Sequence, residues 1–182
     1  MHPWHDLTTG RDISEAFNVV IEVPCGGTVK HELHKKTGLL RLDRILYSAV
    51  YYPANYGVIR RTLGGDGDPI DVLVLMDEPV DPLCVPRARA IGMLPMHDEA
   101  GTDEKIIAVC VDDPGFAEYA KLDDLPVHRR RQIERFFLDY KTLEGKAVET
   151  SDFVDKAEAI RVIEESVVRY QEAFPERAWP AS

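Results

Sequence analysis

The strand-like and helix-like segments of this 182-residue chain fall into two blocks along the sequence. Up to residue 113, short β-branched or alternating segments are separated by Gly and Pro turns, which is typical of β-strands. The predicted strands span residues 17–23, 28–36, 39–46, 58–63, 70–76, 85–96 and 106–111. A bend or bulge is expected at Gly92, inside the longest of them. Many short strands followed by helices predict an α+β fold, packed as a small closed β-barrel with flanking helices.

Two amphipathic helices are predicted after the strands. The first runs from a cap at Asp123 or Asp124 to about Leu143, with a proline in its first turn and a glycine beyond its end. The second is capped by Ser151 or Asp152 and ends before a proline. Its apolar residues recur at spacings of three and four: Phe153, Ala157, Ile160, Ile163, Val167, Tyr170 and Phe174. This stripe indicates a helix face that packs against the barrel.

Length and composition are those of one globular domain, residues 1–182. Within it, residues 1–16 are predicted to be a loosely docked arm and residues 176–182 a polar tail. No apolar run approaches the ~18 residues of a membrane helix, so no membrane contact is expected. No secretion signal is visible, and three widely spaced cysteines indicate reduced thiols: Cys25, Cys84 and Cys110. The expected location is cytoplasmic.

The net charge of −10 is concentrated in the middle of the chain. Residues 66–113 contain 12 acidic and 3 basic side chains, whereas residues 1–65 contain 6 and 8. Such an acidic chain repels a phosphate backbone, so nucleic acid is not an expected partner. If the two regions face each other, one pocket presents cations on one wall and carboxylates on the other. Magnesium-phosphate sites have this composition.

The most acidic turn is Asp66-Gly67-Asp68-Pro69-Ile70-Asp71, which leads directly into the strand at 70–76. Carboxylates this close together repel one another unless solvent or a cation offsets their charge. Gly and Pro make the loop stiff, and an oxygen-only ligand set favours Mg²⁺, Ca²⁺ or Mn²⁺ over zinc. An idle acidic turn on the surface is an equally good interpretation of this spacing alone.

A second acidic turn, containing Asp98 and Asp103, precedes the strand at 106–111. If the strands that follow the two turns are neighbours, five carboxylates converge, and such a cluster needs two or more divalent cations. The basic residues that are candidates to bind phosphate are Lys30, Arg44, Lys105 and Lys141. His31 and His34 lack further zinc ligands and are interpreted as a surface pair. The chain contains no Walker-type loop, HExxH or CxxC motif.

Together these motifs resemble the soluble family I inorganic pyrophosphatases of prokaryotic type. The six-residue acidic turn matches the family signature. Further segments agree in identity, order and spacing: Val20-Ile21-Glu22-Val23-Pro24, Lys30-x-Glu32, Asp43-Arg44, Tyr52-Pro53-x-Asn55-Tyr56-Gly57, Asp98-Glu99-x-Gly101-x-Asp103-x-Lys105 and Tyr140-Lys141. The resemblance covers roughly residues 17–145, and the last helix agrees in character only. Six spaced motifs are far more specific than one D-x-D-P-x-D segment.

The resemblance implies an OB-like five-stranded closed β-barrel with two flanking α-helices, and magnesium-dependent hydrolysis of pyrophosphate to two orthophosphates. Asp68 would be the general base, and Glu22 and Glu32 would position metal-bound waters. Several Mg²⁺ ions, for which Mn²⁺ is a substitute, would be bound by Asp66, Asp71, Asp98 and Asp103. Magnesium pyrophosphate would be bound by Lys30, Arg44, Tyr56, Lys105, Tyr140 and Lys141. A homo-oligomer, specifically a hexamer, is also implied.

The residues alone assign Glu22, Tyr56 and Tyr140 to core packing or a solvated face, and their functional roles come from the resemblance. Two other classes of protein also fit a small barrel. A catalytically silent magnesium-phosphate or nucleotide-binding module is disfavoured because the set of candidate ligands is intact. An OB-type nucleic-acid binder is disfavoured because the acidic middle segment would face the phosphate backbone.

Overall fold

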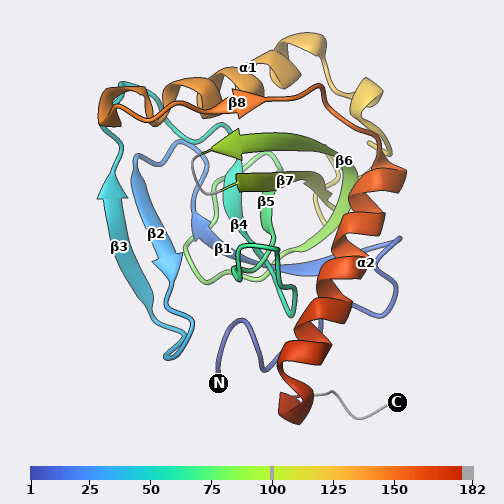
Figure 1. The fold of residues 1–182 in the computed structure, drawn as a ribbon. Helices are drawn as coiled ribbons and strands as arrows, with labels where there is room; N and C mark the ends of the chain where they lie inside the picture. The colour runs from blue at the N-terminus through green and yellow to red at the C-terminus, as the bar shows by residue number, and fades with distance from the viewer. Residues whose placement is uncertain (99–100, 178–182) are drawn as a thin grey trace.

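The computed structural model describes residues 1–98 and 101–177 (Figure 1). Five strands form its central ring: β1 (Phe17–Val23), β4 (Asn55–Ile59), β5 (Asp71–Leu75), β7 (Gly101–Cys110) and β6 (Arg87–Asp98). Each strand pairs with the next in this order, and β1 also pairs with β6, which closes the ring. All pairs are antiparallel except β5 with β7. The predicted α+β fold with a five-stranded closed barrel is confirmed.

Two smaller β elements flank the ring. The strands β2 (Val29–Leu33) and β3 (Leu40–Ile45) form a separate antiparallel hairpin, on the left of Figure 1. Lys30 and Glu32 lie on one face of β2, as the period of two predicts, and Lys30 Nζ is 2.5 Å from Glu32 Oε1. The short β8 (Glu149–Thr150) pairs with β6 and extends the sheet.

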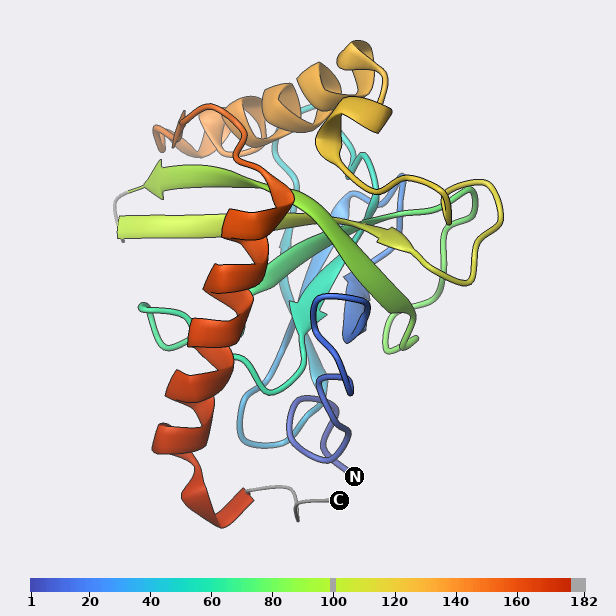
Figure 2. The ribbon, with the colours of Figure 1, turned by 90° about the vertical axis from the view of Figure 1, so that its right-hand side faces the viewer.

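Strands β1, β4 and β5 are buried on both faces for nearly their whole length, which explains why their sequences are mostly apolar. Leu73 belongs to a core shared with α1 (Val127–Asp139), whereas its neighbour Val72 belongs to a core shared with α2 (Lys156–Ala173). Figures 1 and 2 show α1 across one end of the ring and α2 along its side. Within residues 1–98 and 101–177, no helix is long and apolar enough to cross a membrane.

Both helices begin later than predicted. The segment Leu122–Asp124 is a separate 3₁₀ turn (η1), so the predicted aspartate cap of α1 is wrong. α2 is capped by Asp155, whose carboxylate accepts a backbone N–H of the first turn, rather than by Ser151 or Asp152. The residues just before Asp155 pair with β6 instead, and this pairing excludes them from the helix. Two further 3₁₀ turns follow the helices: η2 (Thr142–Glu144) and η3 (Pro175–Arg177).

Two strands also differ from their predicted limits. β4 begins at Asn55 rather than at residue 58, and β7 begins at Gly101 rather than at residue 106. Most of the second acidic segment is therefore strand, because it pairs with β6. The register of β6 against β7 shifts just before Gly92, so the predicted bulge is confirmed. A Cβ on Gly92 would collide with Leu122, and glycine is what lets β6 and η1 approach.

The N-terminal arm, residues 1–16, is packed more closely than predicted. Trp4 is 2% exposed, and its indole N–H donates to the Thr62 carbonyl at 3.1 Å. Its ring centroid lies 5.6 Å from that of Tyr170 and 5.5 Å from that of Phe174, at the end of α2. The prediction of a loosely docked arm is therefore wrong, because its few apolar residues include a large aromatic that fills a site on α2.

Candidate active site

A cleft of about 230 Å³ lies between the ring, the β2–β3 hairpin and the segment after α1. It brings together most of the predicted site residues: Glu22, Lys30, Glu32, Tyr56, Asp66, Asp68, Asp71, Asp103, Lys105, Tyr140 and Lys141. Arg44 is not part of this lining. Asp98 ends β6, and its side chain lies outside the described part of the structure. The closed ring therefore gathers residues from separate parts of the sequence at one place.

The acidic turn owes its shape to hydrogen bonds within the loop. The Asp68 N–H donates to the Asp66 carboxylate at 2.9 Å, and the Gly64 N–H donates to the Asp68 carbonyl at 2.6 Å. Gly67 has a φ of 83°, a left-handed conformation that side chains with a Cβ rarely adopt. The loop holds Asp66 and Asp68 at the exposed rim of the cleft, and the chain then enters β5 at the less exposed Asp71.

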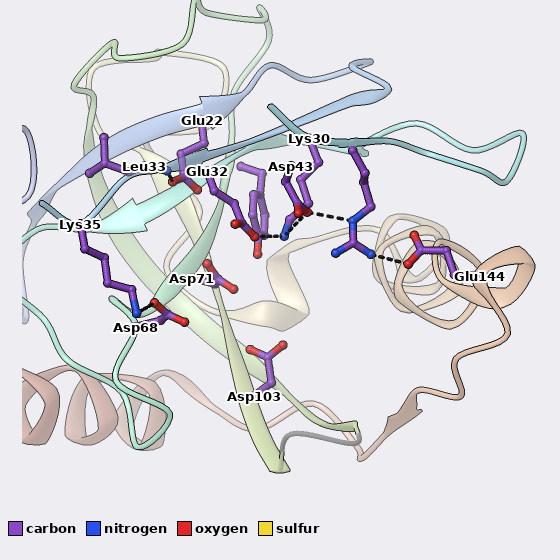
Figure 3. Close-up of polar contacts among 12 residues, drawn as sticks. Glu22, Lys30, Glu32, Leu33, Lys35, Asp43, Asp68, Asp71, Asp103 and Glu144 are labelled. Atoms are coloured by element: carbon purple, nitrogen blue, oxygen red, sulfur yellow. Dashed lines mark hydrogen bonds and ion pairs between the residues drawn. The ribbon is translucent and has the colours of Figure 1, made fainter. Parts of the chain in front are cut away.

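The parallel pairing of β5 with β7 places Asp71 directly opposite Lys105. Asp103 lies two residues before Lys105, on the same face of β7. Figure 3 shows the Asp71 and Asp103 carboxylates. The Lys105 ammonium forms an ion pair with Asp71 and lies 2.6 Å from Asp103 Oδ1. Its Nζ also donates to the Tyr56 hydroxyl at 3.3 Å. Burial opposes the charge of Lys105, but Asp71 and Asp103 outweigh it and raise the pKa. A charged amine is thus held between two carboxylates.

Glu22, on β1, is a buried carboxyl group beside the same cleft and is only 4% exposed. Its Oε1 accepts the Leu33 N–H at 2.6 Å. Burial first, and then the negative charge of Asp71, raise the pKa of Glu22 to about 8. Burial also raises the pKa of Asp103, against the opposing effect of Lys105. The lysines of the cleft therefore do not fully offset its carboxylates.

The cleft fits a hard divalent cation by charge and by donor type. The raised pKa values of Glu22 and Asp103 mean that their charged forms lack compensation, which a cation would supply. Carboxylate oxygens are the ligands that Mg²⁺ and Mn²⁺ prefer. Among the described residues, no three His, Cys, Asp or Glu side chains are grouped to hold one ion, and Lys105 lies between the central pair. Metal binding stays a prediction for Asp66, Asp71, Asp98 and Asp103.

A network of ion pairs links the hairpin to the cleft (Figure 3). Lys30 Nζ lies 3.1 Å from Asp43 Oδ2, in addition to its pair with Glu32. Burial opposes the charge of Lys30, but Glu32 and Asp43 raise its pKa. Arg44 Nε donates to Asp43 at 2.8 Å, and its guanidinium also pairs with Glu144, beyond α1. Arg44 therefore ties the hairpin to the segment after α1 and lies next to the cleft lining.

The tyrosines are both core residues and cleft residues. Tyr56 and Tyr140 are 4% and 5% exposed and pack in the core shared with α1, yet both line the cleft. Burial raises the pKa of Tyr56 well above its ordinary value, so its hydroxyl remains protonated. The Lys141 ammonium lies 5.3 Å from the centroid of the Tyr140 ring. Core packing and a place in the site are therefore compatible for these residues.

Sequence reasoning missed three cleft residues with polar side chains: Lys35, Thr102 and Glu104. Lys35 forms an ion pair with Asp68, and its Nζ donates to the Gly67 carbonyl at 3.1 Å. It follows the end of β2, next to a second lysine, and no local pattern distinguishes the two. Only the position of the hairpin over the acidic turn brings Lys35 to Asp68.

Known proteins are similar in sequence to this chain over most of its length. A family model described as inorganic pyrophosphatase matches residues 19–171. Soluble inorganic pyrophosphatase 1 of Arabidopsis thaliana is 54% identical over 171 residues, which cover 94% of this chain and 81% of that protein. Soluble inorganic pyrophosphatase 2 of Chlamydomonas reinhardtii is 50% identical over 176 residues, which cover 97% of this chain and 92% of that protein.

Solved structures share the fold. The crystal structure of inorganic pyrophosphatase from Thermus thermophilus gives a TM-score of 0.89 at 36% identity, covering 93% of this chain and 99% of that chain. The inorganic pyrophosphatase of Helicobacter pylori gives a TM-score of 0.87 at 43% identity, covering 91% of this chain and 99% of that chain. Sequence and fold therefore lead to the same group of enzymes.

Proposed function

Because the chain belongs to the inorganic pyrophosphatase family, and so is an inorganic diphosphatase, we propose that it hydrolyses magnesium pyrophosphate to two orthophosphates. The observation that carries this proposal is one cleft in which carboxylates and ammonium groups are in direct contact. Pyrophosphate is a polyanion whose cleavage needs charge neutralisation and positioning rather than a covalent intermediate. The lysines of the cleft would provide both, together with cations held by its carboxylates.

In this proposal Asp68 is the general base that takes a proton from the attacking water. It lies at the open rim of the cleft, and Lys35 holds its carboxylate in place. Bound Mg²⁺ would supply a water of lowered pKa and would neutralise phosphate charge. The ions would be held by Asp66, Asp71, Asp98 and Asp103, with Mn²⁺ as a substitute metal. Glu22 and Glu32 would orient water molecules.

The substrate phosphates would be bound by Lys30, Arg44, Tyr56, Lys105, Tyr140 and Lys141. In the free protein Lys30, Arg44 and Lys105 already form ion pairs with neighbouring carboxylates. Their positions are therefore set before substrate enters, and this preorganisation lowers the cost of stabilising charge on the departing phosphate. Lys105 is the most constrained of them, since it is 3% exposed and contacts two carboxylates.

The test is phosphate release from pyrophosphate, with Mg²⁺ and with EDTA, by the wild type and by Asp68→Asn. We expect metal-dependent release that falls by about 100- to 10,000-fold in the variant, the usual contribution of a general base. Magnesium affinity should be retained, because Asp68 is not one of the proposed ligands. Asp81→Asn removes an exposed carboxylate outside the cleft and is the matched control.

Unchanged turnover in Asp68→Asn would remove Asp68 from the role of base. If the folded wild type releases no phosphate with Mg²⁺, Mn²⁺ or Co²⁺, the hydrolase proposal fails. A silent magnesium-phosphate binding module would then be the better description of the cleft.

The proposal extends to assembly and location. A homo-hexamer is supported by the apolar side chains that β3 and its flanks expose: Leu39, Leu42, Ile45 and Tyr47 are 67%, 61%, 52% and 64% exposed. The mass in solution, measured by light scattering, tests it. A cytoplasmic location is supported by three cysteines without a disulfide. The prokaryotic type is supported by coverage of 99% of the bacterial chains.

A further inference from the structure

The cleft contains a cation of its own, the ammonium group of Lys105. The side chain is only 3% exposed, so this charge is enclosed by the protein. The ammonium forms an ion pair with Asp71 and lies 2.6 Å from Asp103 Oδ1. These two carboxylates are among the proposed metal ligands. Lys105 therefore contacts oxygens that a divalent ion would also need.

The sheet fixes this arrangement. β5 and β7 pair in parallel with Asp71 opposite Lys105, and Asp103 lies two residues before Lys105 on the same face of β7. The centroids of the Tyr56 and Phe137 rings lie 5.8 Å and 5.9 Å from Lys105 Nζ. The cation is thus enclosed by two carboxylates and two aromatic rings.

All the hydrogen-bond donors of this ammonium are engaged. A lysine ammonium has three N–H donors. Those of Lys105 have three partners, which are the carboxylates of Asp71 and Asp103 and the Tyr56 hydroxyl at 3.3 Å. No donor remains for a phosphate oxygen while these contacts last. Lys105 must therefore give up at least one of them before it can bind a substrate phosphate.

A divalent ion is a stronger partner for this carboxylate pair than an ammonium is. One ammonium leaves one negative charge of the pair uncompensated, whereas one divalent ion neutralises both. An ammonium and a metal ion held side by side on the same carboxylates would repel each other. The two cations should therefore exclude each other from these oxygens.

We propose that Lys105 competes with the divalent ion: it holds Asp71 and Asp103 together without metal, leaves them when the ion binds, and is thereby freed for a substrate phosphate. This rests on the proposed function, in which Asp71 and Asp103 bind metal and Lys105 binds phosphate. β7 keeps Lys105 in the cleft, and only its ammonium changes partners. Lys105 then sets how tightly the two carboxylates bind metal, and metal binding prepares the donor that the phosphate needs.

The test is calorimetric titration of the full chain with MgCl₂, after EDTA treatment and desalting, without substrate. Lys105→Met removes the competing charge and should bind Mg²⁺ about tenfold more tightly than the wild type, or better. In EDTA this variant should unfold at a lower urea concentration, because Asp71 and Asp103 lose their shared partner. Mg²⁺ should raise that concentration more in the variant than in the wild type. A lysine with only a structural role would lower stability without tightening metal binding.

Lys30→Met is the matched control. Lys30 lines the same cleft and is 17% exposed, but it pairs with Glu32 and Asp43 rather than with Asp71 or Asp103. Its loss should change the Mg²⁺ affinity by less than about threefold. An equal gain in both variants would indicate a general effect of lost positive charge and would overturn the proposal. So would a Mg²⁺ affinity of Lys105→Met equal to or weaker than that of the wild type.

A second measurement follows Lys105 in the wild type and needs no variant. Lysines are acetylated with limiting acetic anhydride, in EDTA or in excess Mg²⁺, and the modified positions are quantified by mass spectrometry. Mg²⁺ should speed the acetylation of Lys105 by about threefold or more relative to Lys121, an exposed lysine outside the cleft lining, because the released ammonium loses its ion pairs. Equal labelling in both conditions would mean that the ammonium stays in place, and would overturn the proposal.

These outcomes separate the proposal from the proposed function. If neither the wild type nor Lys105→Met binds Mg²⁺, both the competition and the proposed metal sites are wrong. If both bind Mg²⁺ equally tightly, only the competition is wrong. Tighter binding by Lys105→Met than by Lys30→Met supports the competition even if no pyrophosphate is hydrolysed.

Discussion

The metal-free protein should lose stability as the pH rises from about 5 to about 8, and Glu22 is the main reason. Its carboxyl group is buried on β1, 4% exposed, in a cleft that already contains Asp71. Two perturbations are combined: a change of pH in EDTA, and the substitution Glu22→Gln. Glutamine keeps an acceptor for the Leu33 N–H, which now donates to Glu22 Oε1 at 2.6 Å. The substitution therefore removes the titration and little else.

The magnitude follows from the pKa. Burial and Asp71 raise the pKa of Glu22 from 4.5 to about 8. Between these values the folded protein holds a proton that the unfolded chain has released, so stability falls as the pH rises. Each pH unit of difference corresponds to about 1.4 kcal/mol, so the loss is at most about 5 kcal/mol, complete above pH ~8. The raised pKa of Asp103 acts in the same direction.

The assay is urea unfolding at several pH values across this window, in EDTA and in excess Mg²⁺. In EDTA, the free energy of unfolding of the wild type should fall with pH, and that of Glu22→Gln should fall much less. Excess Mg²⁺ should stabilise the wild type more at the upper end of the window, because the ion binds the charged carboxylates of the folded state. Glu164→Gln, at an exposed position of α2, controls for the loss of one carboxylate.

A flat profile in EDTA would refute the reasoning, since it would mean that the carboxylates of the cleft are already compensated. If the free energy of unfolding of Glu22→Gln fell with pH as steeply as that of the wild type, another titrating group would be responsible. A Mg²⁺ effect that is the same at both ends of the window would separate metal binding from these carboxylates.

Three other substitutions, the first of them with a control variant, test the packing. Arg60→Met should raise the free energy of unfolding by about 1–3 kcal/mol, because the buried guanidinium has no hydrogen-bond partner among the described residues and its pKa is lowered to about 10. Its control, Arg61→Met, loses a 2.7 Å bond to the His5 carbonyl and should lower the free energy of unfolding. Gly92→Ala should cost about 1–3 kcal/mol in the same urea assay, since its Cβ would lie 2.7 Å from the Val154 carbonyl oxygen. Trp4→Ala should lower the free energy of unfolding by about 3–5 kcal/mol. An unchanged free energy of unfolding would mean that the arm is only loosely docked.

The barrel could be predicted because its strands are marked in the sequence by short apolar runs between Gly and Pro turns. The same local signals failed wherever a tertiary contact decided the outcome. Asp152 has the chemistry of a helix cap, yet Val154 after it pairs with Met93 of β6, and the helix is capped by Asp155 instead. The segment from Asp103 to Lys105 resembles a polar turn in sequence, but β5 and β6 on either side make it a strand.

In the candidate site too, local sequence signals predict some residues, and tertiary contacts decide the others. The carboxylates could be predicted because they are concentrated in two segments whose following strands are neighbours in the sheet. Lys35 and Glu144 could not, since Lys35 meets Asp68 only through the hairpin, and Glu144 meets Arg44 across 100 residues. Lys105 was predicted as a phosphate ligand, but no sequence pattern indicates that it lies between Asp71 and Asp103.

The acidic turn is held at its two ends by hydrogen bonds, and some of these come from α2. The Thr62 hydroxyl donates to the Ile59 carbonyl at 2.7 Å and accepts the Ile70 N–H at 3.0 Å, so it closes the loop across its two ends. The Leu63 N–H donates to the Ser166 carbonyl at 3.0 Å, and Arg169 Nε donates to the Leu63 carbonyl at 2.8 Å. Both contacts come from α2. Because the loop is fixed at its base by a helix outside the cleft, the positions of Asp66 and Asp68 depend on α2 packing rather than on the loop sequence alone.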